Sequence, residues 1–174
     1  MSEPERVDHI DVEFSPPDVG WIDITIATAA QKAELSLSQV FDPFDGEFTG
    51  WLERIVCEPR AALEFDVEGP IAIFAAEPIA ASEDVVFSLM LRLHTNEEEN
   101  EFECIIPRRR LVSDFYNSLV QFWESAVVAE KWLEWMYMYT DPDDIAELDE
   151  RYRRPWSVRS EVVDNYLASS ELGR

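Results

Sequence analysis

The chain has 174 residues, of which 37 are Asp or Glu and 14 are Lys or Arg, so its formal net charge is -23 at pH 7. A field of this sign repels nucleic acid and anionic membranes and attracts basic proteins. Because 47% of the residues are hydrophobic and 12% are aromatic, the composition excludes an acidic disordered chain. The sequence shows neither an apolar leader nor an apolar stretch of membrane-spanning length, so we expect a folded cytoplasmic protein.

Two strands are expected near the start of the chain. Residues 1–20 are polar and are interrupted by consecutive prolines, so we expect a flexible segment there. Isoleucine stands at every second position of residues 21–26, which is the period of a half-buried strand. Leucine and serine alternate in the same way over residues 35–38, which predicts a second strand, antiparallel to the first.

A short helix and four further strands are expected next. Residues 42–46 are rich in turn formers, and the apolar face of residues 51–56 predicts a helix that ends before Pro59. The polar residues 96–100 are expected to form the exposed tip of a hairpin between the last two strands. Alternation of apolar and polar residues places these four strands at residues 63–67, 71–76, 87–93 and 101–106.

The period changes after the last strand. From Arg108 onward apolar residues recur every three or four positions, which predicts a long helix with a broad apolar face. The aromatic residues 132–139 continue this helix or begin another, which ends before Pro142. A last helical pattern occupies residues 158–167.

Together these patterns predict an α+β fold. We expect an antiparallel sheet of about five to six strands over residues 21–106, with the short helix inserted. The C-terminal helices, over residues 108–170, are expected to pack on one face of this sheet. No linker or internal repeat divides the chain, so residues 21–174 are expected to form one domain.

Known catalytic patterns do not match the chain. Its five glycines are too scattered for a phosphate-binding loop, and neither His9 nor His94 has a neighbour at metal-ligand spacing. Cys57 and Cys104 are predicted to be buried free thiols. A calcium loop counted from the acidic segment after the aromatic residues has Ala146 where the template requires glycine. We therefore expect no enzymatic activity, no metal site and no cofactor.

Two acidic clusters are the candidate partner-binding residues. The first lies at the predicted hairpin, and the second follows an aromatic segment whose tryptophans are candidate anchors for a partner. The alternative is that these acids only form a solvated, solubilising surface. The candidates are Glu97, Glu98, Glu99 and Glu101 in the first cluster, Asp141, Asp143, Asp144, Glu147, Asp149 and Glu150 in the second, and the anchors Trp132 and Trp135.

Three consecutive arginines, Arg108, Arg109 and Arg110, open the long predicted helix. The positive end of the helix dipole lies there and disfavours cations. We expect these side chains to pair with acids, either from the sheet or from a partner, with pairing inside the protein favoured.

The expected framework includes residues 21–26, 41–44, 51–53, 63–69 and 107–112, the last leading into a helix that ends near Glu124. These segments resemble small acidic bacterial proteins, many of which look like immunity proteins of polymorphic toxin systems. The resemblance covers about residues 21 to 124 and transfers no site residues. It implies a non-enzymatic inhibitor that binds a cognate toxin domain and blocks its active site or substrate surface.

The leading hypothesis from the sequence is therefore an immunity protein that binds a basic toxin domain, and we expect no direct binding to nucleic acid or membrane. A second hypothesis is a nucleic-acid mimic that regulates DNA- or RNA-binding proteins, for which the acidic groups should form a continuous stripe at phosphate-like spacing. A third is an enzyme of unrecognised type, which would need a concave site with convergent polar groups. The oligomeric state is not predicted by any of these patterns.

Overall fold

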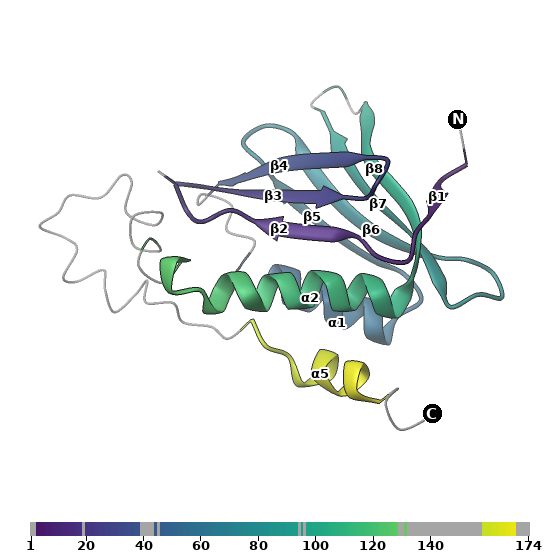
Figure 1. The fold of residues 1–174 in the computed structure, drawn as a ribbon. Coiled ribbons are helices and arrows are strands. Elements are labelled where there is room, and N and C mark those ends of the chain that lie inside the picture. The colour runs from purple at the N-terminus through teal and green to yellow at the C-terminus, as the bar shows by residue number, and fades with distance from the viewer. Residues whose placement is uncertain are drawn as a thin grey trace, which may run out of the picture.

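The computed structural model describes residues 3–18, 20–38, 44, 46–93, 95, 97–128, 131 and 158–169. Within these residues the chain forms two β-sheets and the helices α1, α2 and α5, which Figure 1 shows together. The elements are β1 (Glu5–Arg6), β2 (Asp11–Phe14), β3 (Trp21–Ala27), β4 (Lys32–Ser38), α1 (Glu47–Cys57), β5 (Ala61–Asp66), β6 (Ile71–Pro78), β7 (Asp84–Arg92), β8 (Glu98–Pro107), α2 (Arg108–Glu124) and α5 (Glu161–Ala168).

The predicted α+β class is confirmed, and the strands divide between two sheets. One sheet has the order β1-β8-β7-β6-β5, in which β1 runs parallel to β8 and the other neighbours are antiparallel. The other has the order β2-β3-β4 and is antiparallel throughout. Figure 1 shows α1 and α2 along one side of the two sheets, with α5 on the far side of these helices.

One apolar core joins the inner faces of both sheets to the helices. The isoleucines of β3 that were predicted to face inward, Ile22, Ile24 and Ile26, are almost fully buried. At the centre, the Phe115 ring of α2 meets the Trp51 ring of α1 at a centroid distance of 5.1 Å, edge to face. The same two rings also contact the sheet, Trp51 through Phe74 and Phe115 through Phe87, so the core depends on aromatic contacts between helices and sheet.

The N-terminal segment differs from the sequence expectation. Residues 11–14 form β2, an edge strand that pairs with β3 and buries Val12 and Phe14 in the core. The expectation of a flexible segment over residues 1–20 is therefore wrong for β1 and β2, which both lie within it. The two prolines lie in the connection after β2, so they end the strand without interrupting it.

Asp114, on α2, fixes this N-terminal segment to the helix. Its Oδ2 atom accepts a hydrogen bond of 3.0 Å from the backbone N–H of Ile10, and Ser118 Oγ donates to the carbonyl of Val12 at 2.5 Å. Burial raises the pKa of the Asp114 carboxyl, while the Ile10 N–H and the charge of Arg110 act in the opposite direction. The folded protein therefore binds a proton at Asp114 more tightly than the unfolded chain does.

Replacing Asp114 with asparagine tests this burial. At neutral pH the ionised carboxylate costs stability, and the cost disappears as the pH falls toward the usual value of 3.8. Asp114→Asn keeps an oxygen for the Ile10 N–H and has no charge, so we expect it to raise the free energy of unfolding at pH 7 by about 0.5–1 kcal/mol. Urea unfolding at pH 7 and pH 4 should show the difference from wild type shrinking at the lower pH.

Asp114→Ala is the control for that experiment. It removes the charge and the acceptor together and leaves the buried Ile10 N–H without a protein partner, so it should cost about 1–3 kcal/mol at pH 7. Equal stability of the two variants at pH 7 would contradict this account of the hydrogen bond.

The three arginines at the start of α2 bind inside the protein, but not to acids of the sheet. Arg108 donates to the carbonyls of Ile55 and Glu58 at 2.8 and 2.7 Å, at the end of α1. Arg109 donates to carbonyls at the end of α5 and lies over the Tyr166 ring. Arg110 pairs with Asp114 on its own helix. The unfavourable position of Arg108 and Arg109 on α2 is thus offset by the negative ends of two other helices.

The two thiols differ from each other. Cys104 on β8 is buried, as predicted, whereas Cys57 at the end of α1 is exposed, so the prediction of two buried thiols is wrong for Cys57. The last residue of a short helix lies beyond the stripe that faces the core, which is why Cys57 reaches solvent. No helix in the described part of the chain has the length and hydropathy needed to cross a membrane.

Candidate partner-binding surface

Three of the four glutamates of the first acidic cluster lie on a strand, and Glu97 lies in the connection that precedes it. β8 begins at Glu98, and its first residues pair with the end of β7, including Glu98 with Arg92 and Glu99 with Leu91. The predicted connector, residues 96–100, is therefore wrong for residues 98–100, which belong to β8. These polar residues adopt the strand because β7 offers backbone partners and the exposed end of the hairpin requires no apolar side chains.

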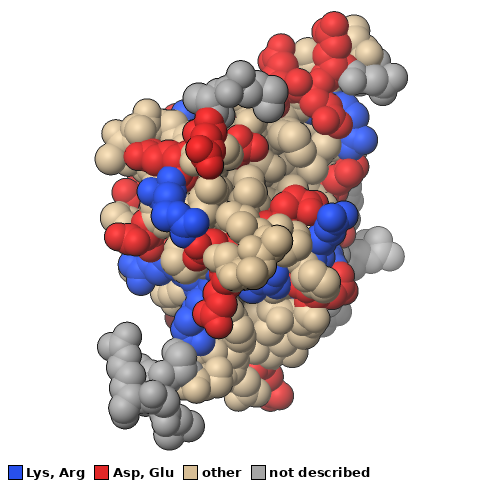
Figure 2. All heavy atoms as spheres, turned by 90° about the vertical axis from the view of Figure 1, so that its right-hand side faces the viewer, with Lys and Arg blue, Asp and Glu red and all other residues tan. Residues whose placement is uncertain are grey.

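We call Glu97, Glu98, Glu99, Glu101 and Glu103 the acidic arm. The first four are exposed and Glu103 is half-buried. Among the described residues no ion pair involves any of the five carboxylates, although six ion pairs form elsewhere. Figure 2 shows acidic side chains spread over one face of the molecule, several of them at its upper edge, with basic side chains between those lower down. The negative charge of the arm is therefore not neutralised by a described neighbour.

The position of Arg92 shows how one of these charges stays unpaired. Arg92 stands directly opposite Glu98 in the register, yet its Nη2 atom donates to Glu64 on β5 at 2.6 Å. The guanidinium thus reaches across β6, in the opposite direction from the arm. Since Arg92 is the basic residue paired with the arm in the ladder, its turn toward β5 leaves the carboxylate of Glu98 facing solvent.

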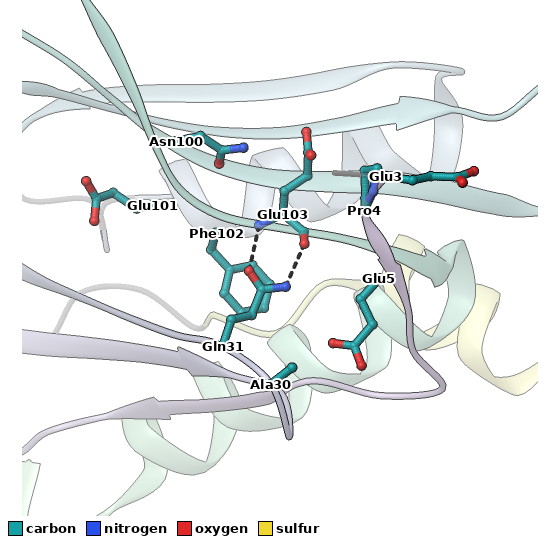
Figure 3. Close-up of a pocket in the computed structure, with 9 residues that line it drawn as sticks. All are labelled: Glu3, Pro4, Glu5, Ala30, Gln31, Asn100, Glu101, Phe102 and Glu103. Carbon is teal, nitrogen blue, oxygen red and sulfur yellow. Dashed lines mark hydrogen bonds between the residues drawn. The ribbon is translucent and has the colours of Figure 1, made fainter. Parts of the chain in front are cut away.

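A hollow of about 360 Å³ lies beside the arm. Figure 3 shows that its walls come from three distant parts of the chain: the segment that leads into β1, the turn between β3 and β4, and β8. Four carboxylates line it, and the lining includes no lysine or arginine. The lining residues are Glu3, Pro4, Glu5, Ala30, Gln31, Asn100, Glu101, Phe102 and Glu103.

Gln31 holds the walls of this hollow together. Its Nε2 atom donates to the carbonyl of Glu103 at 2.6 Å, and the backbone N–H of Glu103 donates to its Oε1 atom at 3.2 Å (Figure 3). One side-chain amide therefore satisfies both backbone groups of Glu103, as a neighbouring strand would. The β3–β4 turn is thereby fixed against the edge of β8.

The charges of the hollow act on the thiol beneath it. Burial, together with the smaller effects of the negative charges of Glu5 and Glu103, raises the pKa of Cys104 to about 12. A thiol in this environment stays protonated, so Cys104 has the properties of a structural residue and not of a nucleophile.

The structure thus brings Glu101, one of the four predicted glutamates of the hairpin, together with Glu103 and with Glu3 and Glu5, which the sequence analysis did not select. Nothing in the local pattern indicated Glu3 and Glu5, because β1 and β8 are far apart in the sequence. The remaining candidates lie outside the described residues: Asp141, Asp143, Asp144, Glu147, Asp149, Glu150, Trp132 and Trp135. His94 and the turn acids Asp42 and Asp45 lie outside them as well.

The chemistry of this surface is that of cation attraction. Among the described residues no group of three or more histidines, cysteines or acids is arranged to hold a metal ion. Carboxylates on an open surface attract ammonium and guanidinium groups, as lysine and arginine side chains of a partner would supply.

Comparison with known proteins identified no relative of this chain. A scan against models of protein families gave no match to this chain. Searches of curated proteins and of solved structures also gave no match. The hypotheses about function therefore depend on the surface itself and on the resemblance described above.

Proposed function

We propose that this protein is a non-enzymatic acidic binding protein that acts as an immunity protein in the bacterial cytoplasm. It neutralises a cognate toxin by covering the active site or the substrate-binding surface of the toxin. The observation that carries the proposal is the acidic arm, whose carboxylates have no ion-pair partner among the described residues. Unpaired like charges destabilise a fold that is already strongly acidic, which favours a role in binding.

The sign of the charge selects the class of partner. Enzymes that act on nucleic acid present lysine and arginine to phosphate groups, and an acidic surface can occupy the same groups. The net charge of -23 also increases the rate at which such a basic partner is encountered. A toxin with nuclease activity, or another enzyme that acts on nucleic acid, has this chemistry.

The fold holds the arm in a fixed position before any partner arrives. Glu98, Glu99 and Glu103 belong to β8, which pairs along its length with β7, and Gln31 fixes the backbone at Glu103. Carboxylates fixed in this way lose less conformational entropy on binding than those of a flexible loop.

Reversal of charge on the arm tests the proposal. The variant Glu98→Lys/Glu99→Lys/Glu101→Lys and wild type would serve as baits in lysate of the native host, with washes at rising salt and identification of the retained proteins by mass spectrometry. We expect wild type to retain one partner with a basic toxin-like domain and to inhibit its activity. The variant should bind this partner at least about tenfold more weakly.

A matched control has the same change in net charge at another place. Glu13, Glu58 and Glu83 are exposed, and their side chains form no ion pair with a described residue. Their replacement with lysine should leave the partner bound. Equal effects of the two triple variants would show that net charge, not the arm, governs binding. A broad set of nucleic-acid-binding proteins lost together at modest salt would instead favour the nucleic-acid mimic.

A further inference from the structure

The outer edge of β8 is only partly covered. β1 pairs with Cys104 and Ile105, and Gln31 closes the backbone at Glu103. The neighbouring residue of the N-terminal segment is Pro4, which has no N–H to continue the pairing. Toward the start of β8, no described strand flanks residues 98–102 on this side. Residues 98–101 are exposed, so this half of the strand has an edge without a described strand partner.

The register identifies the backbone groups on this edge. The N–H of Leu93 donates to the carbonyl of Glu97 at 2.9 Å, so Glu97 directs its carbonyl toward β7. Because backbone groups in an antiparallel ladder alternate in direction, those of Glu98 and Asn100 point outward. Past the register shift near Leu89, the groups of Glu103 also point outward, as the bonds with Gln31 show.

Such an edge is a template for an additional strand. We propose that the partner adds an extended segment bearing lysine or arginine to the edge of β8 at residues 98–102, as a further strand in line with β1. This inference rests on the proposed function and specifies how the basic partner binds.

The arrangement of charge selects the occupant. Alternate residues of a strand face opposite sides of the sheet, so Glu98 and Glu99 place a carboxylate on each side of the segment that pairs here. The acidic hollow receives the end of this segment, beside Gln31. A second copy of this chain would place acid against acid, which disfavours it. The open edge of β4 differs, since Lys32 is paired there with Glu34.

The first test uses a defined peptide and the full-length chain labelled with ¹⁵N. The probe is the hexapeptide Lys-Val-Lys-Val-Lys-Val, and the control is the same peptide methylated on every backbone nitrogen. We expect the probe to slow exchange of the Glu98 and Asn100 amide protons and to bind at least about tenfold more tightly than its methylated form. The amide of Glu99, which already faces β7, should show little change.

A pair of variants at Asn100 tests the same point on the protein. Asn100→Pro removes the outward N–H, whereas Asn100→Ala removes only the side chain. We expect the proline variant to lose at least about tenfold in affinity for the probe and the alanine variant to keep it. Circular dichroism and ¹⁵N spectra of the two variants show whether the fold is retained. If the proline variant does not fold, the comparison of the probe with its methylated form on the wild-type protein still tests backbone pairing.

The outcomes separate this inference from the proposed function. Equal binding of the two peptides would show attraction by charge without strand pairing, which overturns the inference and leaves the proposed function intact. Absence of binding by either peptide would mean that the edge glutamates only prevent aggregation, which also overturns the inference. The proposed function is tested separately. It fails if reversal of charge on the acidic arm leaves capture of the cellular partner unchanged.

Discussion

Replacing Phe115 with alanine is expected to lower the free energy of unfolding by about 3–5 kcal/mol. Phe115 is 1% exposed and lies where α2, α1 and the five-stranded sheet meet. Its ring centroid lies 5.1 Å from that of Trp51, 5.4 Å from that of Phe87 and 6.2 Å from that of Phe74. Alanine would lose these three edge-to-face contacts and leave a cavity that the paired strands cannot close.

Urea unfolding followed by tryptophan fluorescence measures this loss, with Phe115→Leu as the control. Leucine fills most of the space without the aromatic edge, so we expect a smaller loss of about 1–2 kcal/mol. A loss below about 1 kcal/mol for the alanine variant would contradict a core centred on this ring.

Replacing Arg108 with methionine should have the second largest effect, a loss of about 2–4 kcal/mol. The guanidinium donates to the carbonyls of Ile55 and Glu58, and its Nη2 atom donates to that of Pro59 at 3.0 Å. Methionine has a similar apolar stem but no donor, so three carbonyls at the end of α1 would lose a charged partner. Lysine carries the charge as a single point and should recover only part of the loss.

The neighbouring arginines serve as controls for Arg108. Arg110 is exposed, and its ion pair within the described residues is with Asp114 at 3.4 Å, so Arg110→Met should change stability by less than about 0.5 kcal/mol. The stability loss of Arg109→Met should lie between those of Arg108→Met and Arg110→Met, because Arg109 binds two carbonyls of α5. Thermal or urea unfolding of the three variants gives the order directly. Equal losses would show that the charge at the start of α2 matters more than the contacts.

Local periodicity was sufficient for most of the fold. Alternation identified the strands because each sheet has one face in the core, and the three-to-four-residue pattern identified α2 for the same reason. Local periodicity was insufficient for the strand Asp11–Phe14, because acids alternate there with Val12 and Phe14 and make the segment polar. Division of the strands between two sheets could not be predicted, since pairing between distant strands leaves no local signal.

The acidic surface was predicted only in its local part. Consecutive glutamates are visible in any reading of the sequence, so Glu97, Glu98, Glu99 and Glu101 were found. The contributions of Glu3, Glu5 and Gln31 depend on pairing of the N-terminal segment with β8. Likewise, the partners of Arg108 are backbone carbonyls, which every residue possesses, so the sequence contains nothing that marks them.

The pairing of β1 with β8 also affects the order in which the protein is made. Glu5 lies beside Cys104, so β1, which is synthesised before the other strands of its sheet, must wait for β8 to emerge from the ribosome. Contacts between residues so far apart close large loops and slow the folding reaction. While the ribosome is still translating the middle of the chain, the N-terminal β1 segment has no strand to join, and a chaperone that binds nascent chains would encounter it in that state.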